Sequence, residues 1–184
     1  MLSGLANGCD SIAHKTTLER GGITATFLPS SLKNILSKEN IQLAKDIVIN
    51  GGLLISEYFE NIEISNKFSL NLFSKRYIDR DKLQALFSDF VCLSASYSQK
   101  NSFVNGKKTN KDSSFRHALE KALKWEILRG AIHGDDEIFK DEMFNLNKEI
   151  IKNEASAVNI NNISDVLKNL KNKKDKEKSG VLPF

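Results

Sequence analysis

Short apolar runs alternate with helical segments at the start of this chain, and this order restricts the fold more than any other feature. The chain opens with the end of a predicted strand, and two further strands are predicted at residues 23–28 and 53–56. Helices are predicted between them, at residues 10–19 and 37–50, where capping residues and glycines mark the boundaries. Such alternation is typical of a parallel sheet with helices on both faces. The predicted fold class is therefore α/β.

The turn between the first strand and the first helix is a candidate binding site. Gly4 and Gly8 allow backbone conformations that a side chain would forbid, and Asp10 and Ser11 are good N-cap residues for the helix that follows. Unpaired N–H groups at a helix N-terminus attract anions, because the donors and the helix dipole point at the same ligand. The alternative is that the glycines only shape the turn. The predicted phosphate turn consists of Ser3, Gly4, Asn7 and Gly8.

Beyond residue 56 the alternation is less regular. Residues 58–76 form a connection too long for an ordinary turn, and such connections often carry a functional site. A helix is predicted at 77–87, with Leu83, Leu86 and Phe87 facing inward, and residues 96–112 are predicted to form an exposed loop. The remaining predicted strands are 90–95, 125–128 and 157–159, and the remaining predicted helices are 113–124, 137–153 and 164–170.

The basic charge of the chain is concentrated at its end. The formal net charge is +4, and residues 168–178 contain six lysines against two acidic residues, which leaves 21 basic and 21 acidic residues elsewhere. Global basicity is therefore no evidence for nucleic-acid binding, and only local clusters could be. We expect one domain over residues 1–170, followed by a Lys-rich disordered tail over residues 171–184.

Cysteine, histidine and apolar residues are arranged as in a cytoplasmic protein. Cys9 and Cys92 lie far apart in the sequence, which indicates reduced thiols. Three scattered histidines without a CxxC motif argue against a zinc site, and no cofactor is expected. No apolar run reaches the roughly 18 residues that a membrane span needs, and the start of the chain lacks the layout of a signal peptide.

Several stretches of the chain resemble motifs of the DprA/Smf family of DNA-processing proteins. Residues 3–14, SGLANGCDSIAH, are similar to the family's SGLARGID-xx-AH, with Asn7 and Cys9 in place of Arg and Ile. Residues 51–58, GGLLISEY, are close to the family's GGLLISEYP. Three weaker matches follow. Residues 31–32 with 37–40 resemble the family's GLD…YPxEN, and residues 77–89 resemble its F-x-x-RNR…LSD. Residues 150–167 resemble its closing LI-xx-GA…D-I-L. The likeness covers most of residues 1–170 and is most specific in the first sixty.

This resemblance implies a Rossmann-like domain that binds single-stranded DNA, protects it, and helps to load the recombinase RecA during the uptake of transforming DNA. It also implies a homodimer that acts without nucleotide hydrolysis or metal. Two departures are expected to matter. The family's first strand, its first helix and its GxR loop would precede Met1, and the family's SGS-x-x-T-A stretch is replaced by an insertion around residues 101–114.

A cationic segment with one aromatic residue is the best candidate for DNA binding. Single-strand binders combine phosphate partners with an aromatic face on which a base stacks, and arginine donates two hydrogen bonds to phosphate at once. The alternative is a solvated helix end whose charge Asp79 and Asp81 partly neutralise. The predicted nucleic-acid-binding residues are Lys75, Arg76, Tyr77, Arg80 and Lys82.

Other polar residues carry weaker predictions. A second basic patch is predicted at Lys107, Lys108 and Lys111, where the alternative is a polar loop without a binding role. His14 is expected to bond a neighbouring carbonyl rather than a ligand. Glu57 follows a strand, at the end where ligands bind in this architecture, although it could equally hold a loop in place.

An enzymatic function is the less favoured alternative. Related Rossmann-like proteins that cleave nucleoside monophosphates carry a PGGxGTxxE motif, and Glu120 has no such glycine-rich loop before it. The sequence also lacks a recognisable nucleophile, metal set or pair of carboxylates at a suitable spacing. We therefore predict a DNA-binding protein that is not an enzyme. A degenerate nucleotide-sensing or purely structural domain is the other alternative.

Overall fold

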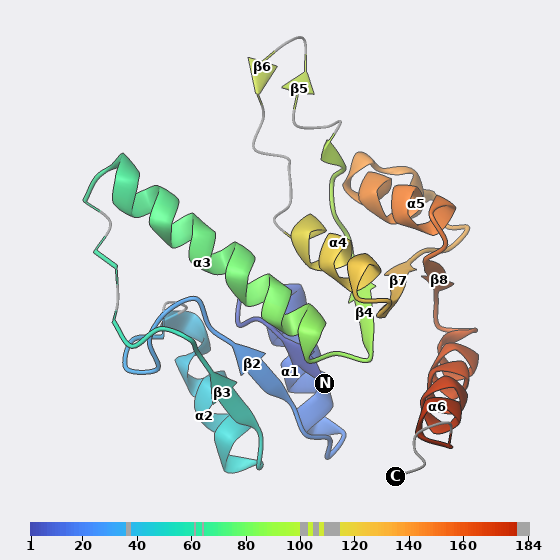
Figure 1. Ribbon diagram of the computed structural model, residues 1–184, viewed down its shortest axis with the longest axis horizontal. Helices are drawn as coiled ribbons and strands as arrows, with labels where there is room; N and C mark the ends of the chain where they lie inside the picture. Colours follow the sequence, from blue (N-terminus) through green and yellow to red (C-terminus); the bar gives the residue numbers. More distant parts are fainter. Residues whose placement is uncertain are drawn as a thin grey trace. The chain divides into compact units, whose positions relative to one another are not determined.

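The computed structural model describes residues 1–35, 38–60, 62–63, 65–99, 103–104, 107–108 and 115–179 (Figure 1). The chain divides into two compact units. The first unit comprises Met1–Ser88 with Ser114–Lys121, and the second comprises Asp89–Ser113 with Ala122–Phe184. Each unit is described by itself.

The first unit contains a three-stranded parallel sheet. Its strands are β1 (Leu2–Ser3), β2 (Ala25–Phe27) and β3 (Leu53–Ile55), in the order β1-β2-β3. The connections are α1 (Cys9–Glu19) and, after a 3₁₀ turn at Lys38–Asn40, α2 (Ile41–Ile49). The second helix ends at Ile49 with Asn50 as its C-cap, and the left-handed backbone of Gly51 (φ 82°) leads into β3. The predicted β-α-β-α-β order of the first 56 residues is thus confirmed.

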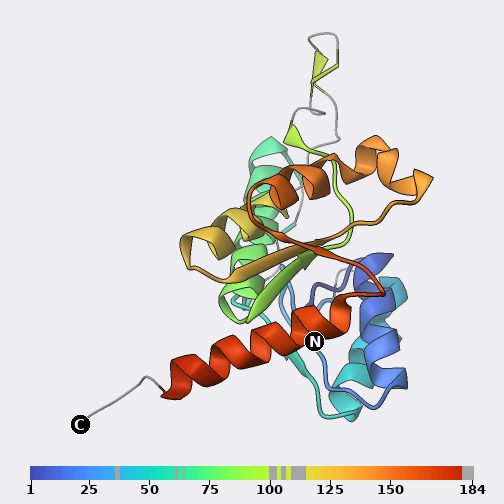
Figure 2. The same cartoon turned by 90° about the vertical axis from the view of Figure 1, so that its right-hand side faces the viewer.

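Helices cover both faces of this sheet. Helices α1 and α2 lie side by side on one face (Figure 2), where Leu54 of β3 packs against the cluster of Leu5, Leu28, Leu43, Ala44 and Ile47. Leu54 lies beside Thr26 in the sheet, and the next residue of β2, Phe27, therefore points to the opposite face. There the Phe27 ring lies 5.5 Å from the ring of Phe87, which directly follows α3.

Helix α3 spans Lys67–Leu86 and begins ten residues before the helix predicted at 77–87. A capping box starts it: the Asn66 side chain accepts from the Ser69 backbone, and the Ser69 hydroxyl accepts from the Asn66 backbone. The prediction that Leu86 faces inward was wrong, since Leu86 is exposed, whereas the largely exposed Phe87 does lie against the buried Phe27 ring. The buried residues of the last two turns are Asp81, Gln84 and Ala85, so a polar residue occupies part of the inward face.

The second unit contains another three-stranded parallel sheet, in the order β4-β7-β8. Its strands are β4 (Phe90–Leu93), β7 (Leu128–Ile132) and β8 (Ser156–Val158). The strand predicted at 125–128 begins only at Leu128, because Glu126 has a positive φ of 57° in the preceding turn. The buried amide of Asn147 donates to the Ser94 and Ile132 carbonyls, both at 2.9 Å, and thereby joins the carboxyl ends of β4 and β7.

The remaining elements differ from their predicted bounds by several residues. The helix predicted at 137–153 consists of 3₁₀ turns at Glu137–Lys140 and Glu142–Phe144 followed by α5. A short antiparallel pair lies within the predicted loop 96–112, and the last helix continues past residue 170, where the predicted tail begins. These elements are α4 (Arg116–Lys124), β5 (Phe103–Val104), β6 (Lys107–Lys108), α5 (Asn145–Lys152) and α6 (Ile163–Ser179).

Two further properties hold for the described residues. None of their helices is both long enough and apolar enough to cross a membrane. Within the same residues, no group of three or more His, Cys, Asp or Glu side chains could hold a metal ion.

Candidate nucleic-acid interface

The loops that follow β1, β2 and β3 lie at one edge of the first unit's sheet. Parallel strands all end at the same edge, which is where α/β sheets bind ligands. The loop after β1 is the glycine turn, residues 4–8. The Asn40 amide holds this turn by donating to the Leu5 carbonyl at 3.1 Å and to Oδ1 of Asn7 at 2.9 Å. Asn7 in turn donates to the Glu39 carboxylate.

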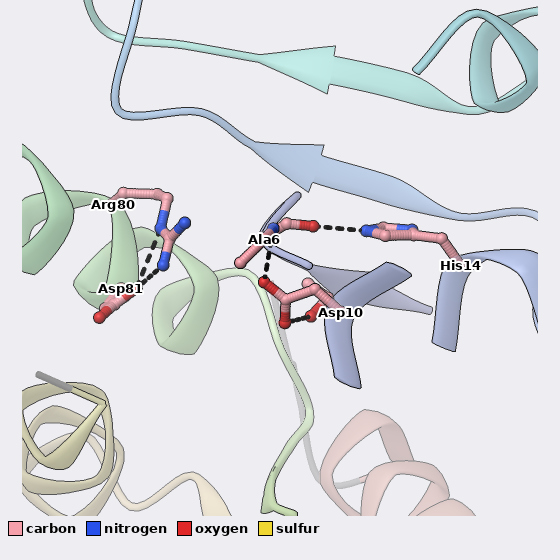
Figure 3. A network of polar contacts seen from close by, with 7 residues as sticks. Ala6, Asp10, His14, Arg80 and Asp81 are labelled. Atoms are coloured by element: carbon pink, nitrogen blue, oxygen red, sulfur yellow. Dashed lines mark hydrogen bonds and ion pairs between the residues drawn. The ribbon is translucent and has the colours of Figure 1, made fainter. Parts of the chain in front are cut away.

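A carboxylate of the chain itself occupies part of the glycine turn (Figure 3). The Ser3 hydroxyl donates to Oδ1 of Asp10 at 2.6 Å, and the Ala6 backbone N–H donates to Oδ2 at 3.2 Å. The prediction that Asp10 or Ser11 caps α1 was wrong: the N-cap is Gly8, at φ 89°, with no side-chain cap. Because Asp10 engages the Ser3 hydroxyl, an external phosphate would meet the turn at its Asn7–Gly8 end.

His14 fixes the other side of the glycine turn. Its buried ring lies between Thr24 and Gly4, with Nδ1 2.6 Å from the Thr24 hydroxyl and Nε2 2.6 Å from the Gly4 carbonyl oxygen. The carbonyl only accepts, so Nε2 carries the proton and Nδ1 accepts from Thr24. Burial lowers the pKa of His14, although the Gly4 carbonyl and Asp10 act in the opposite direction. The geometry matches the expectation that His14 bonds a neighbouring carbonyl.

Arg80 of α3 lies directly against the glycine turn. A Cβ atom at position 4 would be 2.7 Å from Nη1 of Arg80, so the guanidinium occupies the space beside the Gly4 backbone. The guanidinium also donates from Nε and Nη2 to Oδ1 of Asp81, at 3.0 and 2.7 Å. The Arg80 side chain is 12% exposed and that of Asp81 only 1%. Arg80 is therefore a buried ionic partner that joins α3 to the turn.

The other predicted DNA-binding residues on α3 are more accessible. Lys75 is exposed, and Lys82 forms a partly exposed ion pair with Asp79 at 2.7 Å. The Arg76 guanidinium carbon lies 4.1 Å from the centre of the Tyr58 ring. Arg76 also donates to the Glu60 carbonyl at 2.7 Å, which ties the loop after β3 to α3.

Tyr77 is in contact with its neighbours on the same helix. Its ring meets that of Phe73 edge-on, with the ring centres 5.2 Å apart. The Arg80 guanidinium carbon lies 5.1 Å from the Tyr77 ring centre. The Tyr77 side chain is half-buried.

The second basic patch is largely outside what the structure describes. Lys107 and Lys108 form β6, but their side chains are not described, and Lys111 lies outside the described residues.

Three residues of the site were not predicted to act there: Asp10 inside the turn, Asn40 behind it and Tyr58 beneath Arg76. Asn40 belongs to the stretch 37–40 that resembles a family motif, which was the signal that could have identified it.

A parallel α/β unit whose glycine turn meets a cationic helix at the carboxyl edge of its sheet is a Rossmann-like domain. Residues 1–78 of the chain match the family of DNA recombination-mediator protein A. Together with the relatives below, this match shows that the chain is similar to the DprA/Smf family of DNA-processing proteins.

The curated relative is Protein Smf of Escherichia coli K12, which is 38% identical over 56 residues, 30% of this chain and 15% of that protein. The structure of DNA processing protein A from Helicobacter pylori, determined for the single-stranded DNA binding mode of that protein, is similar with a TM-score of 0.63 and 25% identity. The likeness covers 91% of this chain and 66% of that one. DprA from Streptococcus pneumoniae has the same fold, with a TM-score of 0.59 and 24% identity over 85% of this chain and 47% of that one. The chain thus spans less than two thirds of each of these relatives.

Proposed function

We propose that this chain binds single-stranded DNA as a DprA-type protein, at the carboxyl edge of the first unit's sheet. The observation that supports this most directly is the apposition of Gly4 and Arg80, which brings the glycine turn and the cationic segment of α3 together. Both lie in the first unit, and residues 1–78, which match the family, contain the turn and the first half of α3. Helix α3 carries five basic and two acidic residues, so its net charge favours a polyanion.

The accessible side chains supply the two kinds of contact that a single strand needs. Lys75 and Arg76 would pair with phosphates, contacts that position the strand without reading its sequence. The accessible part of the Tyr77 ring offers a surface on which a base can stack, an interaction of about 1–3 kcal/mol per base. The Asn7–Gly8 end of the turn is the place where a further phosphate would approach the N-terminus of α1.

The finer parts of the proposal are supported by the match of residues 1–78 to the family and by the resemblance of the sequence motifs. We propose that the chain protects incoming DNA and assists the loading of RecA in natural transformation, as a cytoplasmic homodimer that is not an enzyme and needs no cofactor. The match of residues 1–78 to the family of DNA recombination-mediator protein A and the likeness to Protein Smf support this role.

The test is a gel-shift titration with labelled oligo-dT at several salt concentrations. The variant Lys75→Ala/Arg76→Ala should weaken binding. The slope of the logarithm of the binding constant against the logarithm of the salt concentration should become less steep by about 0.7 for each phosphate partner that is removed. Tyr77→Ala should weaken binding by about 1–3 kcal/mol. The matched control is Lys15→Ala/Lys45→Ala, which removes the same charge from exposed positions on α1 and α2, across the sheet from α3. Equal losses of affinity in the control and in the α3 variant would contradict the proposed site.

A structural or nucleotide-sensing domain is the second candidate, and two observations favour it. Asp10 places a negative charge inside the glycine turn, and Asp81 pairs with the Arg80 guanidinium. Both carboxylates reduce the attraction of this edge for phosphate. Failure of the unmodified protein to bind oligo-dT at low salt would favour this candidate over DNA binding.

A further inference from the structure

We propose that Phe59 and Lys33 form a second contact for single-stranded DNA, with a base stacked on the Phe59 ring and a phosphate paired with Lys33. This inference rests on the proposed function and extends it to residues outside the predicted site. Phe59 stands where the DprA/Smf motif GGLLISEYP has its final proline, so the ring is a departure of this chain from the motif.

Exposure is the first observation that points to a ligand. The Phe59 side chain is 87% exposed, although burying a phenylalanine ring is favourable by about 1.5–3 kcal/mol. Nζ of Lys33 lies 5.7 Å from the centre of this ring, which is within the range of a cation–π contact. An exposed aromatic ring beside a cation is the combination with which proteins bind single strands irrespective of base sequence.

The second observation is that the loop carrying Phe59 is held in place by contacts on both sides. Ser56 donates to the Ser30 carbonyl at 2.7 Å and accepts from the Tyr58 backbone N–H at 3.0 Å, which joins the loops after β2 and β3. On the other side, Arg76 stacks on Tyr58 and donates to the Glu60 carbonyl. Phe59 lies between two anchored residues, so its ring is presented to solvent by a fixed backbone. A preorganised platform binds with little loss of conformational entropy.

Position is the third observation. Lys33 and Phe59 belong to the loops after β2 and β3, at the same sheet edge as the glycine turn. Arg76 contacts Tyr58, the residue next to Phe59, and is also next to Tyr77 in α3. The Arg76–Tyr58 contact therefore joins the loop that carries Phe59 to the helix that carries Tyr77. The two aromatic residues would each stack one base, with Arg76 on the phosphates between them.

The experiment measures the affinity of the full chain for labelled oligo-dT. Phe59→Ala should raise the dissociation constant about 5- to 150-fold, the effect of one stacked base, and leave the salt dependence unchanged. Lys33→Ala should make the slope of the logarithm of the binding constant against the logarithm of the salt concentration less steep by about 0.7, the effect of one phosphate contact on a single strand. The matched control is Phe68→Ala, which removes another exposed phenylalanine (77%) from the first turn of α3 and should not change the affinity.

A fluorescence measurement tests stacking directly. In a Trp125→Phe background, which removes the single tryptophan of the chain, Phe59→Trp should be quenched on addition of oligo-dT, and Phe68→Trp should not. If Phe59→Ala binds oligo-dT as tightly as the unmodified protein while Lys75→Ala/Arg76→Ala binds more weakly, this inference is overturned and the proposed function stands. If the unmodified protein does not bind oligo-dT, both are overturned.

Discussion

Gly4 and Arg80 lie so close that no side chain fits between them. A Cβ atom at position 4 would be 2.7 Å from Nη1 of Arg80 and 2.5 Å from Oδ2 of Asp10. A side chain at residue 4 would therefore require the Arg80 guanidinium and the Asp10 carboxylate to shift. The glycine was predicted to permit the close approach of a ligand, and in the structure it permits the close approach of a guanidinium.

We expect Gly4→Ala to lower the free energy of unfolding by about 1–3 kcal/mol, the usual cost of overpacking. Arg80 has little room to move away, because its guanidinium donates twice to Asp81 and its side chain is only 12% exposed. Urea unfolding followed by circular dichroism measures the change. An unfolding midpoint equal to that of the unmodified protein would show that the guanidinium is free to shift.

A second prediction concerns the Arg80–Asp81 pair itself. Arg80→Ala should lower the free energy of unfolding by about 1.5–3 kcal/mol, because the Asp81 carboxylate, 1% exposed, loses the charged hydrogen bonds from the guanidinium. Lys82→Ala is the control: it removes the pair with Asp79, which lies on the same helix but is partly exposed, and should cost no more than about 1 kcal/mol. Similar losses of stability in the two variants would mean that burial does not distinguish the two pairs. Because Arg80→Ala is expected to destabilise the fold, it is a poor variant for measuring DNA binding.

The order of elements in the first unit could be predicted because local signals determine it. Apolar runs mark β2 and β3, and Asn50-Gly51-Gly52 marks the end of α2. Helix α3 shows where such signals fail. Its first half exposes Phe68, Leu70 and Leu72, so apolar residues do not mark a buried face, and the capping box at Asn66–Ser69 is the local sign of its start.

The sequence indicates which residue types the candidate site would use, but not how these residues pair with one another. The sequence places Arg80 and Asp81 side by side, and on a helix adjacent residues do not normally face each other. That the Asp81 carboxylate is buried, and therefore engages Arg80, follows from the packing of α3 and not from residue spacing. The same is true of Asp10, which looked like a helix cap and instead accepts hydrogen bonds from Ser3 and Ala6.

A third prediction concerns pH. Burial lowers the pKa of His14 below the ordinary 6.5, so the folded state favours the neutral ring and the unfolded state binds the proton more readily. The stability contributed by neutral His14 is therefore fully present above about pH 6.5 and is lost as the pH falls from there toward the folded-state pKa. Urea unfolding at pH 7.5, 6.5 and 5.5 should show this loss. The loss should be smaller in His14→Asn.

The control for this pH dependence is His117→Asn. His117 is partly exposed beside Glu120, where Nδ1 lies 3.4 Å from the carboxylate. The variant should keep most of the loss of stability between pH 7.5 and pH 5.5. If the pH dependence disappears in His117→Asn and persists in His14→Asn, then His117 and not His14 causes it, and the prediction is refuted.

The last prediction concerns Asn40, which holds the glycine turn from behind. Asn40→Ala should lower the free energy of unfolding by about 1–3 kcal/mol, because the Leu5 carbonyl and the Asn7 side chain both lose a buried donor. Amide hydrogen exchange in residues 5–8 should become faster than in α2, since the turn loses its anchor while the helix keeps its own hydrogen bonds. Gln42→Ala is the control, because it removes an exposed hydrogen bond from the Gln42 side-chain amide to the Asp46 carboxylate one turn away. It should change the free energy of unfolding by less than about 0.5 kcal/mol. Exchange that accelerates equally in the turn and throughout α2 would indicate global destabilisation, and Asn40 would then have no particular role in positioning the turn.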